Sequence, residues 1–436
     1  MPWSNGKGAK ELRASIGMKP LGGIFSVGVE EQYRWKDSVQ TEAEIRVWVA
    51  EGTANGMRPW FTKFSGVLYD KRWLDIVAKI YQLHYRNENY LRNIAPMARV
   101  GMVFSEENRN YSNEKWQQKS GDHALGMYHA LIEDRTPFEM VNDRLLDPEH
   151  LKPFKLLVLP NIASLSTVKC DQLRKFVERG GSLIATFETS LYDETGIRRT
   201  DFGLADLFGV SYDKKVDGPM QNSYLRLKKD TALNQFHQVL KDLEDAYRII
   251  NTINMVKVIP RSSFPDPVTL IPTYPDLPME DVYPRIPETD IRELYLRNVG
   301  KGRIAYFPGD IDRTFWQIMS ADHGKLLRNT IRWALNEEPI AEVNGPGVID
   351  VTVWRQETSM TVHMVNLTNP MMMKGPFREF IPVAAKVTIK IPQGKKVGGV
   401  HLLVSTEKPS FEIKEEKVIL SVSQILDYEI IAIDLT

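Results

Sequence analysis

Short apolar runs alternate with segments of helical spacing along the middle of the chain. Residues 155–160 and 182–187 form nearly continuous apolar runs, and the segment between them is predicted as a helix over 168–178 that a glycine pair ends. Such runs are typical of parallel strands buried on both faces. The alternation continues on either side, with strands expected at 99–104, 138–141 and 302–309 and helices at 121–134 and 322–336. This order predicts a doubly wound parallel sheet.

The amino-terminal part of the chain shows a shorter version of the same alternation. Strands are expected at residues 24–29 and 58–64. Helices are expected at 42–55 and after Asp70, where apolar residues recur at helical spacing. The amino-terminal part therefore amounts to about two βα units.

The carboxyl-terminal part has a different period. After the expected linker at 345–347, apolar and polar residues alternate with a period of two, as in 348–353, 360–364 and 387–391. This period is typical of strands with one buried face, and it predicts an antiparallel β-sandwich. Residues 211–300, which include a proline-rich stretch, predict their elements less clearly. From the three patterns along the chain we expect three domains, at residues 1–92, 93–342 and 346–436.

Composition restricts the classes of partner. Hydrophobic residues make up 42% of the chain and charged residues 26%, which is typical of globular proteins. The 56 basic residues balance the 56 acidic ones, so no net charge favours nucleic acid or a membrane surface as a partner. A single cysteine, Cys170, fits a reducing compartment. Because the first residues also lack the apolar core of a secretory signal, we expect a cytoplasmic protein.

A polar loop, residues 188–196, follows the predicted strand 182–187 at its carboxyl end, where ligands of open α/β sheets collect. The layout resembles the flavodoxin-like fold of class I amidotransferases, which implies a nucleophilic cysteine beside this strand. No cysteine is there. Cys170 falls inside the predicted helix with no histidine near it in sequence, which favours a structural thiol. Glu188 is a candidate for a pocket of the middle domain.

Several stretches resemble family 42 β-galactosidases. Residues 156–161, 180–187, 193–196 and 204–210 resemble the trimerisation domain of these enzymes, and residues 302–313 and 362–367 resemble their distal parts. Residues 33–38 and 58–64 resemble the end of the catalytic (β/α)8 barrel in related glycoside hydrolases. The resemblance implies a glycoside hydrolase of carbohydrate metabolism that binds a carbohydrate and assembles as a homo-oligomer, in particular a trimer.

The chain differs from that family in its barrel. A closed (β/α)8 barrel needs roughly 250 residues, and the first predicted strand begins at residue 24. At most the last two of eight βα units are encoded. The chain is then a fragment, or the remnant packs on another domain, or a partner completes the barrel. A non-catalytic assembly or carbohydrate-binding protein that keeps only the accessory domains is the alternative to a glycoside hydrolase.

Glycosidases need two carboxyl groups that face one sugar. Glu30 and Glu31 follow a predicted strand, but adjacent strand residues point to opposite faces, so one of them at most faces the substrate. We take Glu31 as the catalytic candidate, against the alternative of a solvated carboxylate. The substrate-binding candidates share aromatic or hydrogen-bonding side chains near the strand ends: Glu30, Tyr33, Trp35, Lys36, Asp37, Arg58, Trp60 and Lys63. Aromatic residues that fill a core are the alternative.

Asp310, Asp312 and Arg313 follow another predicted strand. They are candidates for the pocket of the middle domain, and an internal salt bridge or turn is the alternative. His123 and His129 are six residues apart, which does not place them on one helix face, and no zinc-binding motif occurs. We therefore expect neither a metal nor another cofactor.

Overall fold

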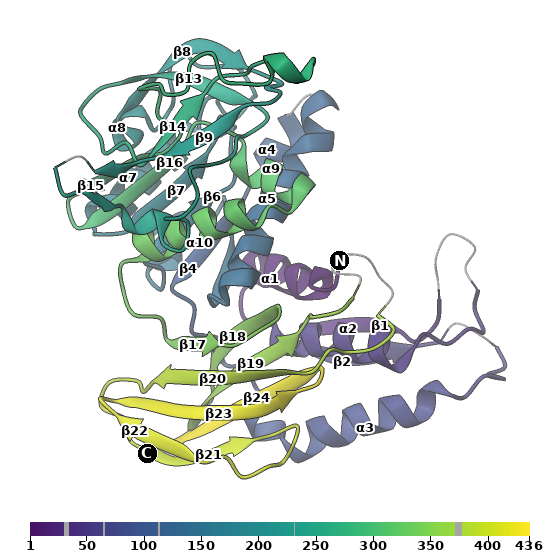
Figure 1. Ribbon diagram of the computed structural model, residues 1–436. Coiled ribbons are helices and arrows are strands. Elements are labelled where there is room, and N and C mark those ends of the chain that lie inside the picture. The colour runs from purple at the N-terminus through teal and green to yellow at the C-terminus, as the bar shows by residue number, and fades with distance from the viewer. Residues whose placement is uncertain (30–34, 64–65, 112–113, 231, 371–376) are drawn as a thin grey trace. The chain divides into compact units, whose positions relative to one another are not determined.

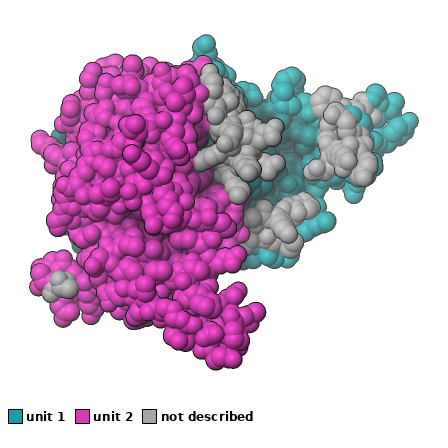
Figure 2. Space-filling model, turned by 90° about the horizontal axis from the view of Figure 1, so that it is seen from above, with its two compact units in different colours: residues 1–98, 135–140, 338–436 teal, residues 99–134, 141–337 magenta. Residues whose placement is uncertain are grey.

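A computed structural model describes residues 1–29, 35–63, 66–111, 114–230, 232–370 and 377–436. The chain divides into two compact units (Figures 1 and 2). Unit 1 consists of residues 1–98, 135–140 and 338–436, and unit 2 consists of residues 99–134 and 141–337. The amino-terminal and carboxyl-terminal segments of the chain therefore share one unit.

The amino-terminal part of unit 1 contains two parallel strands with helices around them. In chain order the elements are α1 (Ser4–Ile16), β1 (Leu21–Ser26), α2 (Glu42–Ala54), β2 (Met57–Thr62), α3 (Trp73–Arg86) and the 3-10 helix η1 (Glu88–Tyr90). β1 pairs with β2 in parallel, from Leu21 opposite Met57 to Ser26 opposite Thr62. Over the described residues these two strands form a sheet of their own, and no closed barrel is present. The two predicted βα units are confirmed, whereas α1 was not expected.

The carboxyl-terminal part of unit 1 is a sandwich of two antiparallel sheets, as predicted. One sheet has the order β17 (Ala341–Asn344), β20 (Val383–Lys390), β23 (Lys417–Ile425), β22 (Phe411–Lys414). The other has the order β21 (Val397–Leu402), β24 (Tyr428–Leu435), β19 (Ser359–Asn366), β18 (Ile349–Arg355), β3 (Ala95–Pro96). Their buried faces share a core that includes Val353, Val362, Val387, Leu420 and Ile431.

Helix α2 joins the strand pair to the sandwich. Thr41 caps its start by accepting a hydrogen bond from the Glu44 amide at 3.2 Å. At its end, the carbonyl of Ala54 accepts hydrogen bonds from the Thr352 hydroxyl and the Trp354 indole, each at 2.7 Å. The barrel-like remnant therefore packs on the β-sandwich, which is one of the three outcomes expected from the sequence.

Unit 2 is built on the predicted parallel sheet. Its strand order is β15 (Tyr295–Val299), β16 (Gly302–Phe307), β7 (Ser182–Thr186), β6 (Leu156–Leu159), β4 (Val100–Phe104), β5 (Phe138–Asn142). The pairs β16–β7, β7–β6 and β6–β4 are parallel, and the edge strand β15 is antiparallel to β16. Taken in chain order, β4, β5, β6, β7 and β16 follow the 2-1-3-4-5 arrangement of flavodoxin-like folds.

Helices and a second group of short strands complete unit 2. The helices are α4 (Glu106–Tyr111), α5 (Glu114–Asp134), α6 (Pro148–Leu151), α7 (Thr167–Glu178), α8 (Ala205–Phe208), α9 (Ile311–Ile318) and α10 (Ala321–Leu335). Between α8 and β15, β8 (Val210–Asp217) pairs with β13 (Met255–Pro260), and β10 (Lys229–Asp230) pairs with β11 (Gln235–Phe236). A further sheet has the order β12 (Arg248–Ile250), β9 (Tyr224–Leu227), β14 (Val268–Ile271). The short 3-10 helices η2 (Gln238–Leu240) and η3 (Met279–Asp281) lie in the same part of the chain.

Candidate functional site

The chain turns sharply where β7 ends. Phe187, the residue after this strand, has a φ of 52°, in the left-handed region that residues with a side chain seldom adopt. Two hydrogen bonds of 2.7 Å hold it, one from its amide to the Phe307 carbonyl and one from the Tyr306 hydroxyl to its own carbonyl. A strained turn of this kind presents the nucleophile in hydrolases with a nucleophile elbow. Here the side chain is a buried phenyl ring, which is not a nucleophile.

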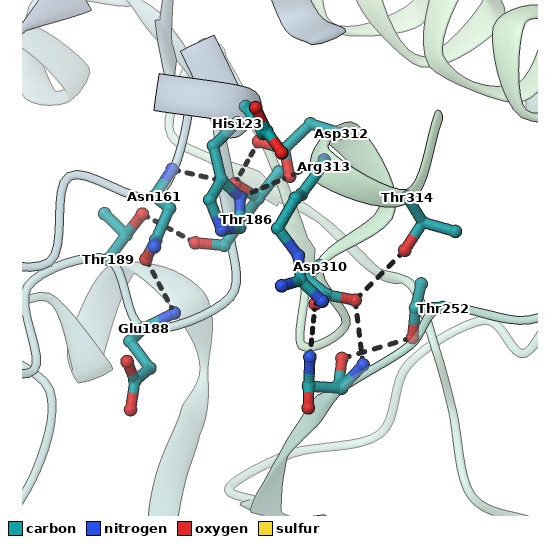
Figure 3. Close-up of polar contacts among 12 residues, drawn as sticks. His123, Asn161, Thr186, Glu188, Thr189, Thr252, Asp310, Asp312, Arg313 and Thr314 are labelled. Atoms are coloured by element: carbon teal, nitrogen blue, oxygen red, sulfur yellow. Dashed lines mark hydrogen bonds and ion pairs between the residues drawn. The ribbon is translucent and has the colours of Figure 1, made fainter. Parts of the chain in front are cut away.

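Asp312, in α9, contacts side chains from α5 and β7 (Figure 3). The His123 ring, from α5, lies with Nδ1 2.7 Å from one carboxylate oxygen, and the Thr186 hydroxyl, from β7, donates to the other at 2.7 Å. The His123 ring also stacks on Phe187, with 5.8 Å between ring centroids. Asp312 and His123 are buried. A histidine oriented by a carboxylate is the usual activator of a nucleophile. The carboxylate and the histidine of such an arrangement are therefore present beside a turn that has no nucleophile.

Asp310, at the start of α9, forms hydrogen bonds with the loop before β13. One of its carboxylate oxygens accepts hydrogen bonds from the Ile253 and Asn254 amides, both at 2.9 Å. The other accepts from the Asn254 side chain at 2.7 Å and lies 2.5 Å from the Arg313 guanidinium. Arg313 is also buried. The salt bridge that the sequence offered as an alternative is therefore present, and both carboxylates of the pair Asp310 and Asp312 are satisfied by the protein.

Glu188 lies at the same edge of the sheet, with only 4% of its surface exposed. Its amide donates to the Asn161 side chain at 3.2 Å, and the Asn161 amide donates to Thr186 at 2.8 Å. Its carboxyl accepts from the Tyr192 hydroxyl at 3.3 Å, and Oε2 has no hydrogen-bond partner among the residues described. Burial raises the pKa of Glu188 to about 8, so the carboxyl holds its proton at neutral pH.

The cysteine is placed as the sequence suggested. Cys170 lies in α7 and is almost completely buried. Burial raises the pKa of its thiol to about 11, so the reactive thiolate is scarce at neutral pH. Cys170 therefore has the environment of a structural thiol.

In unit 1, the structure brings together only part of the proposed sugar site. The Lys63 ammonium donates to the Ser38 carbonyl at 2.5 Å and lies 3.4 Å from the Asp37 carboxylate. The Ser38 hydroxyl donates to the Trp35 carbonyl at 2.7 Å. Trp35, Asp37 and Lys63 thus lie close together in the segments that follow β1 and β2. The predicted Glu30, Glu31 and Tyr33 lie outside the described residues.

Arg58 and Trp60 lie farther back along β2. Arg58, at the start of the strand, donates to the carbonyls of Leu91 and Arg92, both at 2.7 Å. These bonds place its charge away from the carboxyl ends of β1 and β2. Trp60 is opposite Ile24 in the register, and these side chains are 60% and 61% exposed. In a closed barrel, one face of every strand fills the interior. Here that face of the strand pair is exposed to solvent.

Signals for metals and membranes are absent from the described parts of the chain. Among those residues, no group of three or more histidine, cysteine, aspartate or glutamate side chains is arranged to hold a metal ion. No described helix has the length and apolar character needed to span a membrane.

Comparison with known proteins supports the resemblance. Residues 98–247, about a third of the chain, match the family model described as beta-galactosidase trimerisation domain. No curated protein matches the sequence. The middle of the chain is therefore similar to a domain of family 42 glycoside hydrolases.

Solved structures extend this similarity of fold to nearly the whole chain. The α-L-fucosidase isoenzyme 2 from Paenibacillus thiaminolyticus is 16% identical with a TM-score of 0.76, over 97% of this chain and 61% of that one. A β-galactosidase from Bacillus circulans sp. alkalophilus is 12% identical with a TM-score of 0.67, over 99% and 58%. Gan42B, a family 42 β-galactosidase from G. stearothermophilus, is 14% identical with a TM-score of 0.65, over 99% and 56%. The chain spans less than two thirds of the length of each.

Proposed function

We propose that this chain is a glycoside hydrolase homologue of β-galactosidase-like ancestry, whose catalytic barrel needs further βα units that the described residues do not contain. The observation that carries the proposal is the parallel pair β1–β2, which forms a two-stranded sheet of its own and leaves Ile24 and Trp60 exposed on one face. The solved relatives, a fucosidase and β-galactosidases, share this fold and are longer. Catalysis by this chain alone is therefore not expected.

Within this proposal, the residues of β2 and of the segments that follow β1 and β2 keep the roles that the sequence suggests. Glu31 is the catalytic carboxylate, and the substrate is held by Glu30, Tyr33, Trp35, Lys36, Asp37, Arg58, Trp60 and Lys63. The proximity of Asp37, Lys63 and Trp35 supports a polar and aromatic surface at this place. We also propose that Glu188, Asp310, Asp312 and Arg313 surround the remnant of an amidotransferase-like pocket, which the turn at Phe187 and the strand order support.

Two measurements test the enzymatic proposal. The purified chain, incubated with aryl β-galactosides and aryl α-fucosides, should show no turnover, while saturation-transfer NMR should detect weak contact with the sugars that Trp60→Ala diminishes. Absence of any such contact would contradict the sugar-binding role. Turnover that Glu31→Gln abolishes, and that Glu178→Gln on the exposed side of α7 leaves intact, would show that the barrel is functionally complete.

We further propose that the chain forms a homo-oligomer, in particular a trimer, through unit 2. Its match to a trimerisation domain supports this. Leu277 and Met279, in the proline-rich segment of the same unit, are 72% and 76% exposed, and we take this apolar pair as the contact to test.

The assembly has a direct test in light scattering after size exclusion. The wild type should have three times the mass of one chain, and the double variant Leu277→Asp, Met279→Asp should dissociate. Val168→Asp is the matched control, because Val168 is 67% exposed on α7 of the same unit. A monomeric wild type at all concentrations would contradict the proposal.

We also propose a cytoplasmic location, in which a reduced thiol persists. The support is Cys170, which is the one cysteine of the sequence and is buried. Cell fractionation with an antibody to the chain tests the location, and recovery in the medium would contradict it.

A further inference from the structure

A depression of 470 Å³ opens in unit 2 beside β9 and the residues just before β12. Tyr247, Phe236, Glu244, Asp245 and Lys229 are among the side chains that line it. A second depression of 340 Å³ adjoins it, because Lys228 and Phe236 line both. Cavities of a few hundred cubic ångströms are typical of sites for small organic ligands.

Tyr247 forms an aromatic platform at this depression. The Arg226 guanidinium covers one face of the ring, with its central carbon 3.5 Å from the ring centroid. Arg226 also donates to the Tyr247 carbonyl at 2.8 Å, and the Leu227 amide approaches the same carbonyl at 3.4 Å. The side chain of Tyr247 is nevertheless 58% exposed. Arg226 therefore holds the ring in a fixed orientation while much of Tyr247 stays accessible, which reduces the entropy lost on binding.

The polar side chains around the ring favour a neutral ligand with many hydroxyl groups. Glu244 and Asp245 are exposed carboxylates, which accept hydrogen bonds, and Lys229 is an exposed donor. Lys228 lies 3.1 Å from both Asp266 and Glu288, so its ammonium is already paired with carboxylates. The larger depression is lined by three basic and three acidic side chains, so neither an anion nor a cation is favoured over a neutral molecule: Arg226, Lys228 and Lys229, and Glu244, Asp245 and Glu288.

We propose that this depression is a carbohydrate-binding site, separate from the strand ends of unit 1, that takes a neutral oligosaccharide. One sugar ring packs its apolar face on Tyr247, and its hydroxyls donate to Glu244 and Asp245. Because two depressions adjoin at Lys228 and Phe236, the ligand extends over more than one sugar ring. The inference rests on the proposed function only in the choice of carbohydrate as the ligand class.

The test uses the full chain and isothermal titration with galacto-oligosaccharides and cello-oligosaccharides of increasing length. Affinity should rise from mono- to disaccharide and should change little with salt, because the ligand is uncharged. Tyr247→Ala should weaken binding at least tenfold, Tyr247→Phe should retain it because the ring remains, and Glu244→Gln with Asp245→Asn should weaken it.

Tyr283→Ala is the matched control. Tyr283 is 52% exposed and Arg285 covers its ring at 3.7 Å, as Arg226 covers Tyr247, but Tyr283 does not line either depression. This variant should bind as the wild type does. Circular dichroism and the melting temperature verify that each variant is folded.

The inference is overturned if no oligosaccharide of either series binds, or if Tyr247→Ala and Tyr283→Ala bind equally well. The variant Trp60→Ala distinguishes a failure of this inference from a failure of the proposed function. That substitution should diminish sugar contact at the strand ends of unit 1 and leave the Tyr247-dependent affinity unchanged, so either site can fail while the other stands.

Discussion

The molecule contains two parallel arrangements of strands and helices, and they differ in how completely their faces are covered. In the central sheet of unit 2, β6 and β7 are buried along their whole length. In the pair β1–β2, one face packs on helices while the other exposes Ile24 and Trp60. Parallel sheets are normally covered on both faces. The central sheet is therefore covered on both faces, whereas the strand pair is covered on one face and is joined to the sandwich through hydrogen bonds at the end of α2.

The largest expected effect is in the central sheet. Leu157 is fully buried in β6, between the neighbouring strands β4 and β7. Leu157→Ala should lower the free energy of unfolding by about 3 kcal/mol, because it removes buried methyl groups and leaves a cavity. Urea denaturation followed by circular dichroism measures the change. Ile24→Ala is the control in the exposed strand pair, and similar losses in the two variants would contradict the contrast between the sheets.

A smaller effect is expected at the end of the central sheet. In the folded chain the Glu188 carboxyl has a pKa of about 8, whereas the pKa of a glutamate carboxyl in an unfolded chain is about 4.3. The contribution of protonated Glu188 to the free energy of unfolding is therefore fully present below about pH 4.3 and is lost as the pH rises through about 8.

Glu188→Gln keeps the side chain neutral at every pH. Relative to the wild type, the free energy of unfolding of this variant should rise by more than about 1 kcal/mol between pH 5 and pH 9, since one pKa unit corresponds to about 1.4 kcal/mol. Denaturation curves at several pH values measure the gain. Glu178→Gln, at an exposed position, should follow the wild-type profile, and parallel profiles for both variants would show that Glu188 titrates normally.

The smallest effect is expected on the open face of the strand pair. Trp60→Ala should change the free energy of unfolding of the chain by no more than about 0.5 kcal/mol, because substitutions at exposed positions cost little. The same denaturation assay measures it. A loss of several kcal/mol would mean that another part of the protein covers this face.

The sequence predicted elements best where burial leaves a local pattern. The apolar runs at 155–160 and 182–187 correspond to β6 and β7, and the spacing of Asp310 and Arg313 suits the ion pair between them. Elements whose partners are distant were missed. Helix α1 contains Gly6 and Gly8 and buries Arg13, whose charge is compensated by Glu139, 126 residues away.

The candidate site of unit 2 shows the same limit. His123 and Asp312 are 189 positions apart, and only the folded chain brings them within 2.7 Å. The antiparallel pairs of residues 210–300, such as β8 with β13, also join segments that are far apart in sequence and include an irregularity in register. Local patterns do not specify such pairings, because register is set by the faces that the whole fold buries.

Phe187 has a consequence for how this fold can change. Its phenyl ring stacks on the imidazole of His123 at the corner where the chain leaves β7. Phe187→Cys would introduce sulfur there and, in the same step, withdraw the surface on which the imidazole rests. A nucleophile at this corner therefore needs at least one further substitution that supports the imidazole, and the variant without that second substitution is expected to be less stable.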